Sequence, residues 1–162
     1  MNPKRSLEEQ IVSILQQKGW QVTCAESCSG GMIASRLVNV AGVSDVFGES
    51  YVTYANSAKH KLLGVSQQTL EEYGAVSPEV AKQMARGAAE QAKAQTAIAV
   101  TGIAGPGGGT DEKPVGLVYI GCYVEGEVFV TQNHFQGNRM EIRTQTTEAA
   151  LSLLLDKLLR YV

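Results

Sequence analysis

Residues 20–40 read WQVTCAESCSGGMIASRLVNV, and this stretch decides the fold. Its first six residues alternate largely between apolar and polar side chains, which predicts a β-strand. Residues 32–40 have the apolar spacing of a helix, and Gly30 and Gly31 stand between the two elements. The stretch therefore predicts a strand-to-helix turn, which exposes side chains and free backbone N–H groups at the carboxyl end of a sheet.

The predicted turn carries reactive groups. Ser27, Cys28 and Ser29 offer two hydroxyls and a thiol beside the carboxylate of Glu26. A nucleophile next to free N–H groups can attack a carbonyl and hold the negative charge that develops. A purely structural role fits equally well, with Ser29 as a helix N-cap and the two glycines forming a tight turn. The stretch matches neither Gly-x-Ser-x-Gly nor Ser-x-x-Lys.

Length and composition predict a single domain over residues 1–162. Hydrophobic residues make up 44% and charged residues 19% of the 162 residues, as in a globular chain. The net charge of −2 and the lack of a basic stripe argue against direct nucleic-acid binding and against a membrane surface. We expect a cytoplasmic protein, since no signal peptide or membrane-spanning run is visible.

The cysteines argue for a reducing compartment. Cys24, Cys28 and Cys122 are odd in number, which does not suit a disulfide framework. Only His60 and His134 could join them as soft metal ligands. We therefore expect no metal site.

The order of elements predicts an α/β fold. Helices are expected at residues 6–18, 32–40, 55–63, 66–73, 77–93 and 138–161, and strands at 20–25, 46–54, 96–101, 115–125 and 128–135. Helices and strands alternate early and a hairpin turns late at Glu125 and Gly126, so we expect a three-layer α/β/α sandwich with a mixed, mostly parallel sheet. The Ala-rich helix and the hairpin edge could each serve a homodimer or higher homo-oligomer.

A second strand-to-helix junction lies at residues 51–59, YVTYANSAK. If the two junctions are neighbours, Ser27, Tyr54 and Lys59 meet in one crevice. A desolvated neutral lysine can act as the general base for a serine, and Tyr54 could hold the pair by a hydrogen bond. Spacing alone also fits a solvated helix lysine and an aromatic at the core edge.

Two further segments suit substrate binding. Thr101, Gly102 and Gly105 follow a buried strand, and glycines there allow backbone to approach a ligand closely, although no Walker A motif is present. Arg139 and Arg143 open the last helix, where arginines suit a phosphate or carboxylate. A flexible loop and a solvated helix start are the alternatives.

Five stretches together resemble the CinA C-terminal domain family. They are AESCSGG at 25–31, YVTYANSAK at 51–59, GAVSPEVA at 74–81, VTGIAGPGGG at 100–109 and KPVGLVY at 113–119. The resemblance covers essentially the whole chain in order. The family includes stand-alone nicotinamide mononucleotide deamidases of the PncC type. Longer members carry an additional N-terminal domain of molybdopterin-binding type, and the length of this chain suggests the stand-alone form.

The resemblance implies an amidohydrolase that converts nicotinamide mononucleotide and water to nicotinic acid mononucleotide and ammonia. It implies Ser27 and Lys59 as the catalytic pair and requires no metal or cofactor. One departure is Ser29, where the family usually has threonine. We expect backbone N–H groups of the turn, which includes Ser29, Gly30 and Gly31, to hold the oxyanion. Charge and helix position make Arg143, helped by Arg139 and the 102–105 loop, our choice for the substrate phosphate.

Three alternatives stay open at this point. The chain could be a catalytically inactive nucleotide-binding paralogue. Cys28 could be the nucleophile, although no histidine in the motif would activate it. A partner protein in DNA uptake or recombination is a third, disfavoured by the negative net charge.

Overall fold

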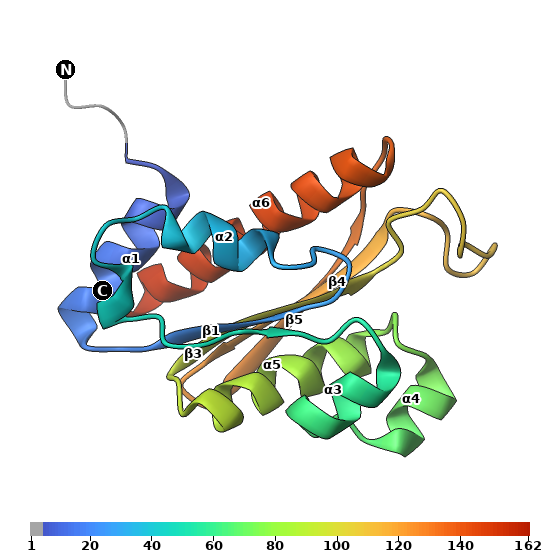
Figure 1. Ribbon diagram of the computed structural model, residues 1–162, viewed down its shortest axis with the longest axis horizontal. Helices are drawn as coiled ribbons and strands as arrows, with labels where there is room; N and C mark the ends of the chain where they lie inside the picture. The colour runs from blue at the N-terminus through green and yellow to red at the C-terminus, as the bar shows by residue number, and fades with distance from the viewer. Residues whose placement is uncertain (1–4) are drawn as a thin grey trace.

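The computed structural model describes residues 5–162 and shows a five-stranded sheet between two helical layers (Figure 1). The strands lie in the order β2-β1-β3-β4-β5. Their bounds are β1 (Val22–Glu26), β2 (Tyr51–Val52), β3 (Thr96–Gly102), β4 (Leu117–Val124) and β5 (Glu127–His134). β1 pairs in parallel with β2 and β3, while β4 pairs antiparallel with β3 and β5. The predicted mixed sheet is confirmed.

The sheet is less parallel than we expected. Its antiparallel pairings run over seven and eight residues, and its parallel ones over only four and two. The reason is the β4–β5 hairpin, whose two-residue turn at Glu125 and Gly126 has positive φ at both positions and sets a long register. The predicted hairpin turn is confirmed there.

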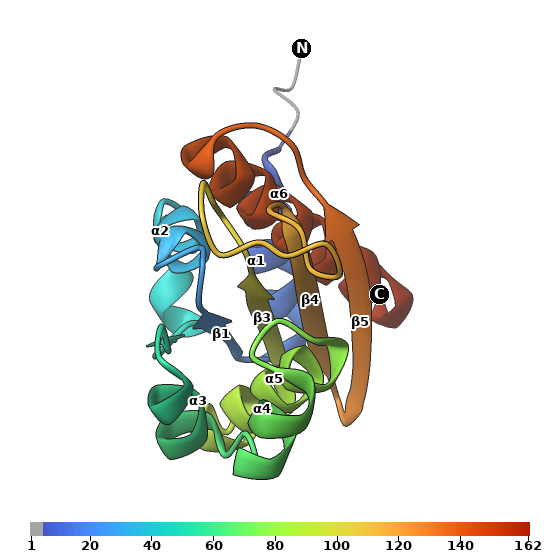
Figure 2. The same ribbon diagram turned by 90° about the vertical axis from the view of Figure 1, so that its right-hand side faces the viewer.

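One face of the sheet is covered by α1 (Leu7–Lys18), α2 (Met32–Val38) and α6 (Arg139–Leu158). Side chains from these helices and from β1, β3 and β4 form the larger hydrophobic core. Short 3₁₀ turns, η1 (Val43–Asp45) and η2 (Leu159–Tyr161), follow α2 and α6. Viewed from the side, α6 crosses over the sheet with its N-terminus near the start of α2 (Figure 2).

The opposite face carries α3 (Asn56–Leu63), α4 (Gln67–Tyr73) and α5 (Pro78–Ala92). α5 lies against the sheet through small side chains such as Ala85 and Ala88. α3 packs on α5 so closely that a Cβ at Gly87 would lie 1.8 Å from the carbonyl oxygen of Leu63. This close packing holds α3 against the sheet end where the candidate site lies.

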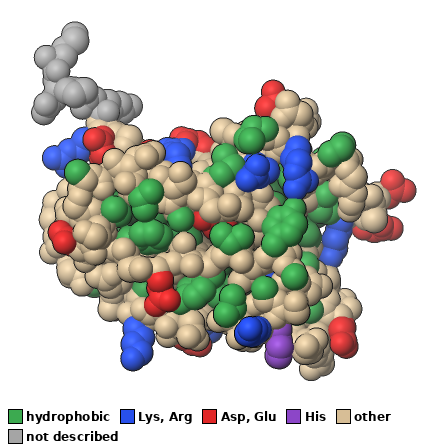
Figure 3. Space-filling view, in the orientation of Figure 1, with side chains coloured by type: hydrophobic (Ala, Val, Ile, Leu, Met, Phe, Trp, Pro, Cys, Tyr) green, Lys and Arg blue, Asp and Glu red, His purple; other side chains and the backbone are tan. Residues whose placement is uncertain are grey.

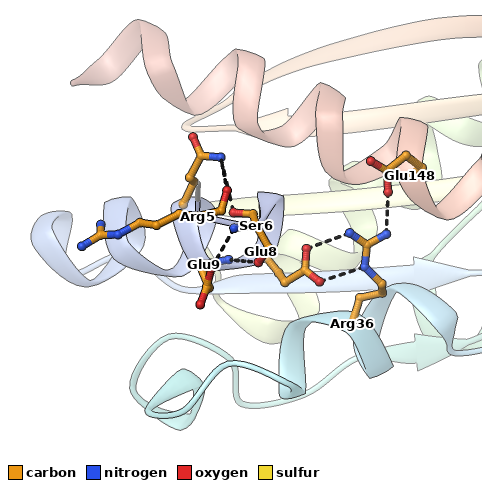
Figure 4. A network of polar contacts seen from close by, with 7 residues as sticks. Arg5, Ser6, Glu8, Glu9, Arg36 and Glu148 are labelled. Carbon is orange, nitrogen blue, oxygen red and sulfur yellow. Dashed lines mark hydrogen bonds and ion pairs between the residues drawn. The ribbon is translucent and has the colours of Figure 1, made fainter. Parts of the chain in front are cut away.

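A polar network ties the three helices of the first layer together (Figure 4). The Arg36 guanidinium of α2 donates to both carboxylate oxygens of Glu8 on α1, at 3.0 and 2.7 Å. Its third donor bonds Glu148 on α6 at 2.6 Å. The guanidinium beside Glu8 holds the pKa of that carboxyl below its usual value. The network therefore fixes α2 between its two neighbours.

The prediction of the second strand is mostly wrong. We expected a strand over 46–54, but only Tyr51 and Val52 pair with β1 in a regular ladder. Before them the chain bonds β1 irregularly, with Val22 N–H donating to Val46 O and Thr23 Oγ1 to Glu49 O.

The surface seen in Figure 3 mixes side-chain types, with hydrophobic groups in separate patches and both acidic and basic groups spread among them. Over residues 5–162, none of the helices has the length and apolar character needed to cross a bilayer.

Candidate active site

Ser27 and Lys59 lie together at the carboxyl ends of neighbouring strands. Ser27 directly follows β1, and Lys59 lies in the first turns of α3, which follows β2. The Lys59 Nζ donates to Ser27 Oγ at 3.1 Å and to the Thr53 carbonyl oxygen at 2.7 Å. The predicted meeting of the two side chains is what the structure shows.

The Lys59 ammonium is buried at an unusual depth for a lysine. Its side chain is 1% exposed, and no carboxylate within residues 5–162 pairs with it. Burial lowers the pKa of Lys59 from 10.5 to about 8, since an ammonium group loses solvation in the interior. A substantial fraction of Lys59 is therefore neutral near physiological pH, as a general base requires.

The Glu26 carboxylate caps α2, a role the sequence reasoning did not assign. It is fully buried and accepts hydrogen bonds from the N–H groups of Gly31, Ile33 and Ala34 at 3.0–3.1 Å. The N-cap residue of α2 is Gly31, which has no side chain to do this. A carboxylate at the end of a strand, followed by a Gly-Gly helix start, was the available signal.

Ser29 does not act as the N-cap that the structural alternative required. It is fully buried, and its Oγ has no hydrogen-bond partner among the described residues. Gly30 and Gly31 have φ of +59° and +101°, so both positions need glycine. Ser29, Gly30 and Gly31 shape the turn through their backbone and do not line the cavity beside Ser27.

A cavity of about 180 Å³ opens beside the Ser27 and Lys59 side chains. It is smaller than the pockets that enclose a whole drug-sized ligand. Its lining comes from the segments after β1 and β2, the end of β3 and the loop that follows it, the segment before α5, and the start of α6. The lining residues are Ser27, Cys28, Tyr54, Asn56, Lys59, Ala75, Val76, Thr101, Gly102, Ala104 and Arg139.

Tyr54 lies at the cavity rim and does not hold the dyad. Its side chain is 64% exposed, and its hydroxyl accepts from Arg139 Nη2 at 2.8 Å. The Nη1 of Arg139 donates to the Gly105 carbonyl oxygen at 2.7 Å. The expected hydrogen bond from Tyr54 to the dyad is therefore wrong, because Tyr54 points to the start of α6.

Arg143 contacts the turn, and our choice of it as the first phosphate ligand is not supported. Its Nε donates to Cys28 O at 2.9 Å and its Nη2 to Ser29 O at 3.1 Å. It is half-buried and does not line the cavity, whereas Arg139, one helical turn earlier, does. The two arginines of one helix face thus reach different parts of the site.

The last two residues of β3, Thr101 and Gly102, both line the cavity. Thr101 Oγ1 donates to Ala75 O at 2.7 Å and so joins this end of β3 to the segment before α5. A Cβ at Gly102 would meet Val118 Cγ2 at 2.5 Å. Gly105 takes part only through its carbonyl bond to Arg139.

Asn56, Ala75 and Val76 also line the cavity, and none of them was predicted as a site residue from the sequence. Each lies in a stretch that carried the family resemblance, and that was the available signal. Ala75 and Val76 precede α5, and nothing local indicates that this segment reaches across to β3.

The next two observations concern a cysteine nucleophile and a metal ion. Burial raises the pKa of the Cys28 thiol to about 11, so little thiolate is present near neutral pH. Over residues 5–162, no cluster of three His, Cys, Asp or Glu side chains suited to a metal ion occurs. The nucleophilic side chain that Lys59 Nζ contacts is the Ser27 hydroxyl.

Comparison with known proteins places the chain in a family. The sequence profile of the CinA C-terminal domain matches residues 4–158. The chain is 49% identical over 157 residues to a putative competence-damage inducible protein of Caldicellulosiruptor saccharolyticus, covering 97% of this chain and 38% of that protein. A protein of the same description from Clostridium kluyveri is 52% identical over 145 residues, 90% of this chain and 35% of its own. The chain thus spans little more than a third of these curated relatives.

Solved structures agree with the fold over nearly their full length. The competence/damage inducible protein CihA from Agrobacterium tumefaciens has a TM-score of 0.89 at 42% identity, covering 96% of this chain and 98% of that one. The competence damage-inducible protein A (ComA) from Klebsiella pneumoniae has a TM-score of 0.92 at 33% identity, covering 96% and 97%. The profile match, the relatives and the shared fold show that this chain belongs to the CinA family, through its C-terminal domain.

Proposed function

We propose that this chain hydrolyses the carboxamide of nicotinamide mononucleotide, releasing ammonia and nicotinic acid mononucleotide, with Ser27 as nucleophile and Lys59 as general base. The observation that carries the proposal is the 3.1 Å contact between Lys59 Nζ and Ser27 Oγ at a buried lysine whose pKa is about 8. The substrate class comes from the family resemblance. The cavity beside the dyad supports it because a flat pyridine carboxamide needs little enclosed volume.

Acylation follows from the dyad geometry. Neutral Lys59 accepts the Ser27 hydroxyl proton while Ser27 Oγ forms a bond to the carboxamide carbon. The resulting oxyanion is stabilised by backbone N–H groups of the turn. Lys59 then donates its proton to the amide nitrogen, the C–N bond breaks, and ammonia leaves with an acyl-Ser27 behind. The Thr53 carbonyl keeps Nζ in place throughout.

Deacylation reverses the roles. Water gives a proton to Lys59 and attacks the acyl carbon, and the bond to Ser27 Oγ breaks as Oγ recovers that proton. The nucleotide phosphate stays outside the small cavity. Arg139, which is exposed at the rim and linked to Tyr54 and Gly105, is our revised choice for the group that binds it.

Ammonia release from nicotinamide mononucleotide tests the proposal directly. Wild type should release ammonia, and Ser27→Ala or Lys59→Ala should lose at least a thousandfold in kcat because each removes one half of the acylating pair. Cys28→Ala serves as the matched control in the same turn and should retain most activity. Folded wild-type protein that binds the mononucleotide but releases no ammonia would favour the inactive paralogue instead.

A further inference from the structure

The turn that carries Ser27 is held from two sides by groups of opposite charge. The Glu26 carboxylate accepts from the N–H groups at 31, 33 and 34, and the Arg143 guanidinium donates to the carbonyls of Cys28 and Ser29. Inside the turn, the N–H of Gly30 bonds Ser27 O and the N–H of Met32 bonds Ser29 O. Within residues 5–162, this leaves the N–H groups of Cys28 and Ser29 without an acceptor.

One of those free N–H groups belongs to the peptide that Arg143 contacts. The Cys28 carbonyl and the Ser29 N–H are the two polar ends of a single planar trans peptide, so they point in opposite directions. A guanidinium bonded to the carbonyl fixes the plane of that peptide and with it the backbone of Cys28, because the peptide unit is rigid. Ser29 is fully buried and does not line the cavity, whereas Cys28 does. Of the two free N–H groups, the one that belongs to a cavity residue is therefore that of Cys28.

We propose that Arg143 is a positioning residue for the nucleophile turn. By holding the carbonyls of Cys28 and Ser29 it keeps Ser27 Oγ towards Lys59 and keeps the free N–H of Cys28 at the cavity, where this N–H stabilises the oxyanion formed at Ser27. This deepens the proposed function and rests on it. Arg143 touches neither the cavity nor the dyad, so its effect runs through the backbone.

The fit around Arg143 supports a fixed geometry. Its Nη2 lies 3.1 Å from the position a Cβ would take at Gly30, so the guanidinium lies directly against the turn at a residue with positive φ. Two parallel donors of one planar group meet two consecutive carbonyls at 2.9 and 3.1 Å. A lysine offers a single flexible ammonium and cannot reproduce this pairing.

Steady-state kinetics of Arg143→Lys separate the positioning role from substrate binding. We expect kcat to fall roughly ten- to a hundredfold with KM nearly unchanged, because losing an oxyanion donor outright costs about 10²–10³ in kcat. Arg139→Lys should mainly raise KM. Arg86→Lys is the matched control, since Arg86 also donates to a backbone carbonyl, at Gly126, but far from the turn. Millimolar guanidinium should partly restore kcat to Arg143→Ala.

Reaction of Ser27 with a fluorophosphonate, followed by mass spectrometry, makes the test independent of the nucleotide substrate. Labelling should be slower in Arg143→Lys than in wild type and equal to wild type in Arg86→Lys. Equal labelling in all three, or an Arg143→Lys defect confined to KM, overturns the positioning role. Labelled wild type that releases no ammonia would overturn the nucleotide substrate alone, and a Ser27 that never reacts removes the nucleophile and the inference together.

Discussion

At the scale of single residues, the proposed reaction depends on the protonation state of Lys59. Burial at 1% exposure lowers its pKa to about 8, and the proposed mechanism requires a neutral Nζ. The kcat/KM of ammonia release should therefore rise with pH and level off above about 8. A profile that is flat from pH 6 to 9 would show that another group limits the reaction.

The same pKa makes a prediction for stability. Between about pH 8 and 10.5 the unfolded chain keeps the Lys59 proton while the folded chain releases it. The free energy of unfolding therefore increases as the pH rises through this window. Relative to Lys59→Met, wild type should gain on the order of 3 kcal/mol across this window. Denaturant unfolding at pH 7.5 and pH 10 measures the difference. Lys61→Met, exposed on the same helix, should parallel wild type.

At the scale of elements, the start of α2 depends on one carboxylate. Glu26→Gln would place an amide group against three N–H donors and should lower the free energy of unfolding by about 1–3 kcal/mol. Glu90→Gln on the exposed side of α5 is the control and should cost little. Urea unfolding of both variants decides the matter, and a cost for Glu26→Gln no larger than the control would exclude the capping role.

Elements with local signals were predicted well from the sequence. The helices predicted at 6–18 and 77–93 are α1 (Leu7–Lys18) and α5 (Pro78–Ala92); α1 begins after a capping box at Ser6 and ends at Gly19, and α5 begins after Ser77. These signals lie within a few residues of the helix end that they mark. β2 was mispredicted because a parallel edge strand is defined by its partner, and residues 46–50 bond β1 without forming a ladder.

In the candidate site, too, some contacts were predictable from the sequence and others were not. The meeting of Ser27 and Lys59 was predictable because two consecutive strand-to-helix junctions open at the same sheet edge. The contacts of Tyr54 and Arg143 were not, since both depend on where α6 crosses the sheet. Nothing in residues 138–145 alone shows which arginine faces the cavity and which faces the turn.

At the scale of the whole molecule, the Arg36 network joins three helices far apart in sequence. Arg36→Lys removes the paired donors to Glu8 and should cost about 1 kcal/mol at pH 7. The pKa of Glu8 is lowered in the folded chain, so this stabilisation is full above its ordinary value of 4.5 and is lost as pH falls through the lowered one. The difference in the free energy of unfolding between Arg36→Lys and wild type, measured by urea unfolding, should therefore shrink towards pH 3. Arg160→Lys, whose arginine lies 3.8 Å from an exposed Asp156, should show no such pH dependence.

Because α6 contacts the turn, the order of synthesis along the chain decides when the site is complete. The Ser27–Lys59 bond joins residues 32 positions apart, whereas the Arg143–Cys28 bond joins residues 115 apart. A nascent chain that has left the ribosome only as far as β5 holds both members of the dyad but neither Arg139 nor Arg143. The turn and the cavity rim are completed only by α6, which is synthesised after β5, so a polypeptide that stops before α6 carries its serine and lysine without the arginines around them.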